Sequence, residues 1–191
     1  MPLFRPTLHL AALLVAGSLG AQESAAPDAD AGPAPAATET PAAAPELVNG
    51  AQVGDWTVVC EAIAVNRTNC ALTQVRVRTE GGALLAGVVV APAGEAGADT
   101  VLTVRVPAGA WLAAGVALRA DSEGSQPVEL DWQVCGAELC EAAVQLDTAA
   151  LDTLTAAGVA ILGYSPTPGA EPLLLTIPMN GLSEGLSGLR G

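Results

Sequence analysis

The chain has 191 residues, of which 20 are acidic and seven are basic, and its formal net charge at pH 7 is −13. When the ends of the chain are set aside, this length allows about one folded domain. None of the basic residues is a lysine, and so negative a protein lacks the cluster of basic side chains that neutralises a phosphate backbone, which excludes nucleic acid as an expected partner.

Residues 1–21 have the parts of a secretory signal peptide. Arg5 supplies a positive charge, residues 10–19 form an apolar run, and Ser18, Gly20 and Ala21 offer the small side chains that a signal peptidase accepts. An uncleaved anchor is the alternative, but the run has only about ten residues, whereas a bilayer-spanning helix needs roughly 20. We therefore expect a periplasmic or secreted protein with no transmembrane segment in the mature chain.

Residues 22–48 predict a disordered linker rich in alanine, proline and acid. Up to Glu46 this stretch contains no base and no apolar side chain larger than alanine, so burial cannot offset the entropy lost on ordering. Repeated prolines favour an extended spacer, although a tail without function is an equal alternative. The first cysteine of the chain is Cys60, so we expect no lipid anchor directly after the signal.

Residues 49–191 predict one mainly β domain. Short runs of β-branched or alternating apolar residues are separated by Gly, Pro, Asp and Asn, which is typical of strands and turns. The runs do not alternate with long helices, so we expect an antiparallel β-sandwich, or a flattened barrel, and not a parallel α/β sheet. The expected strands are residues 56–60, 71–78, 84–91, 100–106, 116–120, 128–135, 142–146, 159–164 and 173–177.

One short helix is expected near residues 147–157. Asp147 is a good N-cap, because its carboxylate accepts hydrogen bonds from backbone N–H groups of the first turn. Leu151 and Leu154 follow at helical spacing, and Gly158 ends the pattern. The sequence also indicates a shorter helical tail around residues 182–189.

The four cysteines predict two local disulfides, Cys60 with Cys70 and Cys135 with Cys140. Four cysteines allow three connectivities, and we favour the local one because each pair closes a short loop that contains turn residues. The spacing is wrong for zinc, and an oxidising compartment favours disulfides. The four residues between Cys135 and Cys140, and the acids beside them, also disfavour a redox site. We therefore interpret both pairs as structural.

No catalytic set is recognisable in the sequence. The one histidine, His9, lies in the signal peptide, which removes a Ser-His-Asp or Cys-His arrangement from the mature domain. The absence of lysine removes Schiff-base and Ser-Lys chemistry, and neither a phosphate-binding glycine loop nor a nucleophile elbow is present. We expect no enzymatic activity, no cofactor and no metal.

Carboxylates remain as candidates for chemistry. Asp121 with Glu123, and Glu129 with Asp131, are each two residues apart, which on a strand places both members of a pair on one face. Such a pair, or Asp55, serves as acid and base in a hydrolase or as a weak calcium site. A solvated strand face or a plain turn is the simpler interpretation, and we favour it.

The three tryptophans fall into two kinds. Trp56 precedes Cys60 and Trp132 precedes Cys135 by a few residues, and a tryptophan beside a disulfide in a β domain usually packs in the core. Trp111 lies in a loop and is the best candidate for an exposed aromatic contact with a partner, but even there we favour burial in the core or partial burial.

Several short motifs, taken in order, resemble the invasion-associated locus B family. The resemblance covers residues 50–186, and its departures are Leu139, where members often have glycine, and the lack of lysines near the end of the helix. The motifs are Gly54-Asp55-Trp56, Cys60, Cys70-x-x-x-Gln74, Pro107 with Gly109, Gly115-Val116-Ala117-Leu118-Arg119, and the pair Cys135 and Cys140 followed by Ala142 and a leucine-rich helix.

The resemblance implies an exported β-sandwich protein of Gram-negative bacteria, located in the periplasm or envelope. In some pathogens such proteins are linked to entry into host cells, and the family offers no established catalytic residues to carry over. Our first hypothesis is a binding domain whose partner is an unknown protein or glycan of the envelope or the host surface. The alternatives are a carboxylate-based hydrolase and a structural envelope-stress protein.

Overall fold

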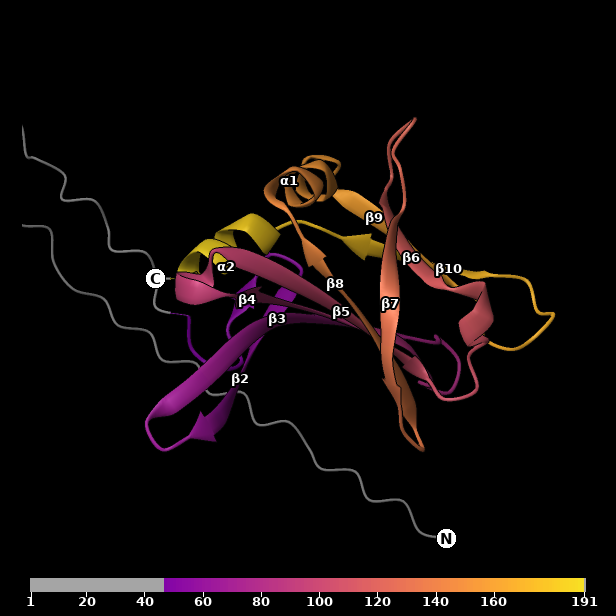
Figure 1. The fold of residues 1–191 in the computed structure, drawn as a ribbon, viewed down its shortest axis with the longest axis horizontal. Coiled ribbons are helices and arrows are strands. Elements are labelled where there is room, and N and C mark those ends of the chain that lie inside the picture. Colours follow the sequence, from indigo (N-terminus) through magenta and orange to yellow (C-terminus); the bar gives the residue numbers. More distant parts are fainter. Residues whose placement is uncertain (1–46, 191) are drawn as a thin grey trace, which may run out of the picture. The chain divides into compact units, whose positions relative to one another are not determined.

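The structure, a computed structural model, describes residues 47–190 except the side chain of Ala96, and its ten strands join into one antiparallel sheet (Figure 1). The predicted signal peptide, and the predicted linker up to residue 46, lie outside the described residues. The strand order is β1-β2-β3-β4-β5-β8-β7-β6-β9-β10. The strands are β1 (Gln52–Val53), β2 (Trp56–Ala64), β3 (Arg67–Val77), β4 (Leu84–Ala93), β5 (Asp99–Pro107), β6 (Val116–Ala120), β7 (Val128–Cys135), β8 (Leu139–Leu146), β9 (Val159–Tyr164) and β10 (Leu173–Pro178).

Strand β7 changes partner halfway along its length, and this change bends the sheet. Residues 128–130 pair with β6, whereas residues 131–135 pair with β8. A register shift between Trp132 and Val134 adds to the bend. The prediction of a mainly β, antiparallel domain is confirmed, but the two separate layers of a sandwich are not found, because β7 joins both halves into one sheet that curls as a half-barrel.

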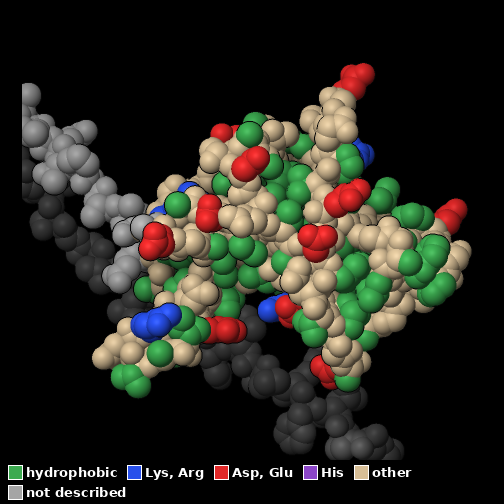
Figure 2. All heavy atoms as spheres, viewed as in Figure 1, with side chains coloured by type: hydrophobic (Ala, Val, Ile, Leu, Met, Phe, Trp, Pro, Cys, Tyr) green, Lys and Arg blue, Asp and Glu red, His purple; other side chains and the backbone are tan. Residues whose placement is uncertain are grey.

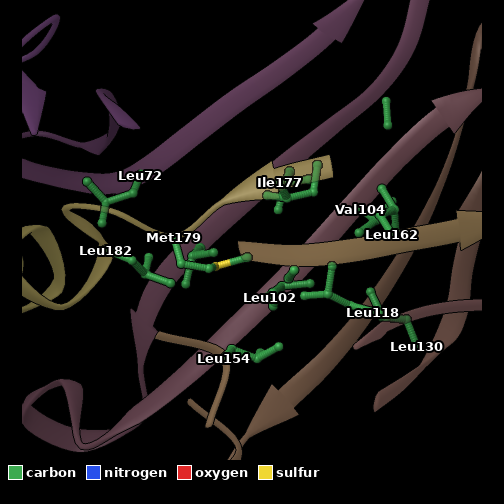
Figure 3. Packing of buried hydrophobic residues seen from close by; sticks show 14 of the residues in the cluster. Leu72, Leu102, Val104, Leu118, Leu130, Leu154, Leu162, Ile177, Met179 and Leu182 are labelled. Carbon is green, nitrogen blue, oxygen red and sulfur yellow. The ribbon is translucent and has the colours of Figure 1, made fainter. Parts of the chain in front are cut away.

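One face of the curled sheet carries the hydrophobic core. Successive side chains of a strand point to opposite faces, and the buried set alternates accordingly, as with Val88 on β4, Val104 on β5 and Ala142 on β8. Figure 3 shows buried side chains from different strands converging, among them Leu102, Leu118 and Ile177. Burial of these aliphatic side chains is the main source of the domain's stability.

Two helices pack on the sheet. Helix α1 (Thr148–Ala156) contacts β6, β8 and β9, and helix α2 (Leu182–Arg190) contacts β1 to β4. The predicted N-cap is confirmed, since Asp147 Oδ1 accepts a hydrogen bond of 2.7 Å from the Ala150 N–H. Helix α2 covers the short helical tail that the sequence indicates around residues 182–189, and it extends one residue further. Among the described residues, no helix is long and apolar enough to cross a membrane.

Strand β3 exposes two apolar side chains and buries a polar one, which is the reverse of the usual distribution in a strand. Val75 and Val77 are exposed on the outer face, whereas Gln74 is buried on the inner face. Gln74 Nε2 donates to the Pro178 carbonyl at 2.7 Å, and Arg76 Nε donates to the Thr176 carbonyl at 2.9 Å. Both acceptors belong to β10, the last strand of the sheet. Side chains of β3 therefore donate hydrogen bonds to backbone carbonyls of an edge strand that pairs with no further strand.

Each disulfide joins the two strands of one hairpin. Cys60 on β2 bonds to Cys70 on β3, and Cys135 on β7 bonds to Cys140 on β8. In both pairs the cysteines are directly opposite in the register, with their Cα atoms 4.0 Å apart. These are the local pairs that the sequence favours, and they hold strand pairs that already lie side by side.

The domain begins slightly earlier, and its strands run slightly longer, than the sequence predicts. Leu47, within the predicted linker, packs against the core. Strand β1 was not predicted, because its two residues are too few to show a period. Strands β2 and β3 extend past the first disulfide to a shared turn at Val65 and Asn66.

Candidate functional site

A surface depression opens at the fork where β7 leaves β6 for β8, and we call it the fork depression. Its volume is about 380 Å³. The walls come from three segments and one further residue that the fold brings together at this point. They are residues 113–117 before and within β6, residues 129–131 of β7, residues 163–165 at the end of β9, and Pro172.

Two hydrogen bonds hold the fork open by fixing the loop before β6. The pairing of β6 with β7 ends at Val116 and Leu130, because β6 begins at Val116 while β7 continues beside β8. There the Trp132 indole Nε1 donates to the Leu112 carbonyl at 3.0 Å, and the Trp111 N–H donates to the Ser165 carbonyl at 2.9 Å. The short 3-10 helix Leu112–Ala114 is thereby tied to both β7 and β9.

Two carboxylates line the fork depression from β7. Glu129 and Asp131 are exposed and lie on the face opposite Leu130, which points into the core. This is one of the two pairs that the spacing places on one face of a strand. The other pair, Asp121 and Glu123, lies in an exposed turn between β6 and β7 and does not line the depression.

Ser165 places its hydroxyl in the same depression. The residue is only 6% exposed, and its side chain makes no hydrogen bond to another described residue. The hydroxyl oxygen is not one of the fully buried atoms without a partner in residues 47–190, so a ligand in the depression can reach it. No local pattern marks Ser165 in the sequence, since its position depends on how β9 meets β6 and β7.

The three tryptophans take different positions. Trp56 is fully buried, as predicted, and its indole N–H is the one buried side-chain donor within residues 47–190 that has no partner. Trp132 is partly buried against the core. Trp111 is 42% exposed and the adjacent Leu112 is 41% exposed, so an aromatic and an aliphatic side chain stand beside the depression.

The remaining charged groups do not converge on a catalytic or metal arrangement. Within the described residues no three His, Cys, Asp or Glu side chains gather as a metal site requires. The one ion pair in this part of the chain joins Arg105 Nε to Glu141 Oε1 at 3.0 Å. Acidic side chains outnumber basic ones on the face that Figure 2 shows, and the fork depression adds two acids with no basic neighbour in its lining.

The first motif residues of the resemblance have structural roles outside this depression. The turn at Gly54 packs backbone to backbone against Gly181, and the Asp55 N–H donates to the Asn180 carbonyl at 3.0 Å. Trp56 is buried in the core, and Gln74 donates a hydrogen bond to the Pro178 carbonyl of β10. The motif residues at Gly54, Trp56 and Gln74 therefore report a fold, whereas Gly115, Val116 and Ala117 of a later motif line the fork depression.

Comparisons with known proteins agree with this fold. The crystal structure of invasion associated protein B from Bartonella henselae matches with a TM-score of 0.60 and 23% sequence identity, over 73% of this chain and 92% of that one. A search among curated proteins finds no match. The profile of the invasion associated locus B (IalB) protein family matches residues 56–190, from the buried tryptophan of β2 to the end of α2. With both disulfides and the curled sheet inside that span, the chain belongs to the IalB family.

Proposed function

We propose that this IalB-family chain is an exported, non-enzymatic interaction domain of the cell envelope, and that the fork depression contacts its partner. The observation that carries the proposal is the composition of the depression. It combines two exposed carboxylates with the hydroxyl of Ser165, and the exposed Trp111 lies two residues before the lining residue Ala113. These groups form hydrogen bonds, ionic contacts and apolar contacts with a ligand.

Export is supported by two independent features. Both disulfides belong to the described domain, and structural disulfides persist in oxidising compartments such as the periplasm. The sequence of residues 1–21 has the composition of a cleavable signal. A periplasmic or secreted location follows, with a protein or glycan of the envelope or of a host surface as the partner.

A binding role is favoured over catalysis by the environment of the two acids. Acid–base chemistry by a carboxyl pair requires a site that excludes water and positions a substrate. Glu129 and Asp131 are both open to solvent. The described domain also contains neither histidine nor lysine to activate Ser165.

Site-specific photo-cross-linking in living cells tests the proposed contact. The photoreactive amino acid p-benzoylphenylalanine is placed at Leu112, beside the depression, or at Val65, which is 91% exposed in the turn between β2 and β3. We expect a discrete cross-linked product from position 112 and none from position 65. Products from both positions, or from neither, would contradict a partner at the fork.

A carboxylate-based hydrolase remains the second candidate, because Glu129 and Asp131 do share one depression. It predicts hydrolysis of a chromogenic glycoside or ester that Glu129→Gln abolishes and Glu123→Gln leaves intact. Turnover that is equal in both variants, or absent throughout the substrate panel, removes this candidate.

A further inference from the structure

We infer that the fork depression binds a cationic side chain, lysine or arginine, presented by a partner protein. This inference rests on the proposed function and names the chemistry of its ligand. Three observations support it: the charge of the walls, the state of Ser165 and the apolar surroundings.

The walls carry two negative charges without a local counter-charge. Glu129 and Asp131 lie two residues apart on one face of β7, and like charges at that separation repel each other. The lining contains no arginine, and the one ion pair among residues 47–190 involves Arg105 and Glu141. A cation placed between the two carboxylates would relieve the repulsion and form charge-assisted hydrogen bonds.

The hydroxyl of Ser165 provides an independent indication of a polar ligand. The residue is more than nine-tenths buried, lines the depression and makes no hydrogen bond within the described chain. Its oxygen can accept a hydrogen bond from a ligand. An ammonium group has three N–H donors and a guanidinium group has five, so either one can reach both carboxylates and this hydroxyl together.

The apolar part of the surroundings favours a long side chain over a bare metal ion. Val116, Ala117 and Pro172 line the depression, and the methylene stems of lysine and arginine bury well against such groups. Trp111 stands exposed next to it, and an aromatic ring face attracts cations. A calcium ion would instead require six to eight oxygen ligands, and no group of three metal-binding side chains is present in this part of the chain.

The test is a titration of the full, disulfide-bonded mature protein followed by backbone NMR shifts. The probe is the peptide acetyl-Ala-Lys-Ala-Lys-Ala-amide, and its matched control is the same peptide with both lysines Nε-acetylated, which removes the charges and keeps the length. We expect saturable shifts at Ala117, Gly163 and Ser165 with the charged peptide. The acetylated peptide should bind at least about tenfold more weakly, since charge-assisted hydrogen bonds are lost.

Two double variants that remove the same charge separate a site from general attraction. Glu129→Gln with Asp131→Asn should weaken binding of the charged peptide by about tenfold or more. Asp121→Asn with Glu123→Gln, on the turn outside the depression, should change it by less than about twofold, since exposed distant charges are screened. Ser165→Ala should weaken binding by a factor of about three to ten, through loss of one hydrogen bond to a charged donor.

Several outcomes would overturn the inference. Equal weakening by both double variants would indicate non-specific attraction to an acidic protein. Spermidine binding as tightly as the peptide would indicate a soluble amine as the ligand and not a protein side chain. If the peptide causes no shift while position 112 still cross-links, the interaction domain stands and its ligand is not cationic.

Discussion

Gln74 on β3 and Pro178 on β10 are 104 positions apart in the sequence and are joined by a hydrogen bond of 2.7 Å. The amide of Gln74 also accepts a hydrogen bond from Arg76 through its Oε1 atom, at 2.5 Å. Because Gln74 is buried, it can satisfy both of these contacts only in the folded state. The pair connects the first half of the curled sheet to its last strand.

Replacing Gln74 should therefore destabilise the domain. Gln74→Ala leaves the Pro178 carbonyl and the Arg76 guanidinium without their partner, and we expect a loss of about 1–3 kcal/mol in the free energy of unfolding. Urea unfolding followed by tryptophan fluorescence measures it. The matched control is Gln145→Ala at an exposed position of β8; a loss as large in the control would count against the role of the hydrogen bond.

Stability at alkaline pH should depend on Tyr164. Its hydroxyl donates to the Leu85 carbonyl at 2.7 Å. Burial raises the pKa of Tyr164 above its ordinary value of 10.0, and the charge of Arg78 lowers it by a smaller amount. The folded state then holds this proton to higher pH than the unfolded state, so the tyrosine's contribution is complete below pH 10 and falls as the pH rises through the raised value.

The composition makes this effect measurable, because the chain has one tyrosine and no lysine. Tyr164→Phe should lower the free energy of unfolding by about 1 kcal/mol at neutral pH, and should flatten its decline above pH 10. Denaturant titrations at a series of pH values give the slope, and phenolate absorbance reports the tyrosine directly. An unchanged slope in the phenylalanine variant would assign the decline to another group.

Each disulfide should contribute separately to stability. Cys60→Ala with Cys70→Ala, or Cys135→Ala with Cys140→Ala, should cost about 2–3 kcal/mol by chain entropy, with the longer loop of the first pair giving the larger value. Thermal unfolding of the two double variants measures both costs. Peptide mapping of the wild-type protein without reductant should yield only the two local links, and a peptide that joins Cys60 to Cys135 would refute the pairing.

The contact between Gly54 and Gly181 should tolerate no side chain. Gly181 has φ +86°, and a Cβ there would meet the carbonyl oxygen of Val53 and the amide nitrogen of Gly54. Gly50 has the same φ of +86° with open space around it. Both alanine variants carry the left-handed strain of about 1–2 kcal/mol, so Gly181→Ala should exceed Gly50→Ala by a further 1–3 kcal/mol or so from overpacking. Equal melting temperatures would show that the turn can move apart.

Local patterns predict much of this fold, because strands and helix caps depend mainly on residues that are close together in the sequence. The bounds of β6, β7 and β9, the Asp147 cap and the hairpin disulfides follow from period, turn residues and spacing. The orientation of β3 does not follow from such a pattern. Its valines point outward and Gln74 points inward, since the free edge of β10 needs donors, and the need for them arises only in the assembled sheet.

The candidate site is predictable only in part, for the same reason. The spacing of Glu129 and Asp131 places both on one face of a strand. The loop position of Trp111 marks it as the best candidate for an exposed aromatic residue, although burial in the core or partial burial is the favoured interpretation. That β7 pairs first with β6 and then with β8 is a long-range choice between partner strands, and it alone creates the fork. Ser165 becomes part of the site through that choice, without any signal of its own.

The placement of both disulfides within single hairpins also affects the order of events in a chain made from its N-terminus. Cys60 and Cys70 are both present long before Cys135 is synthesised, so the first bond can close while it has no wrong partner to meet. Strand β5, by contrast, must wait for β8, which is its neighbour in the sheet but is the third strand after it in the chain. Until residues 139–146 are synthesised and pair with β5, that strand has an open edge. During this interval the backbone of the partly folded domain is most accessible for pairing with a strand of another chain.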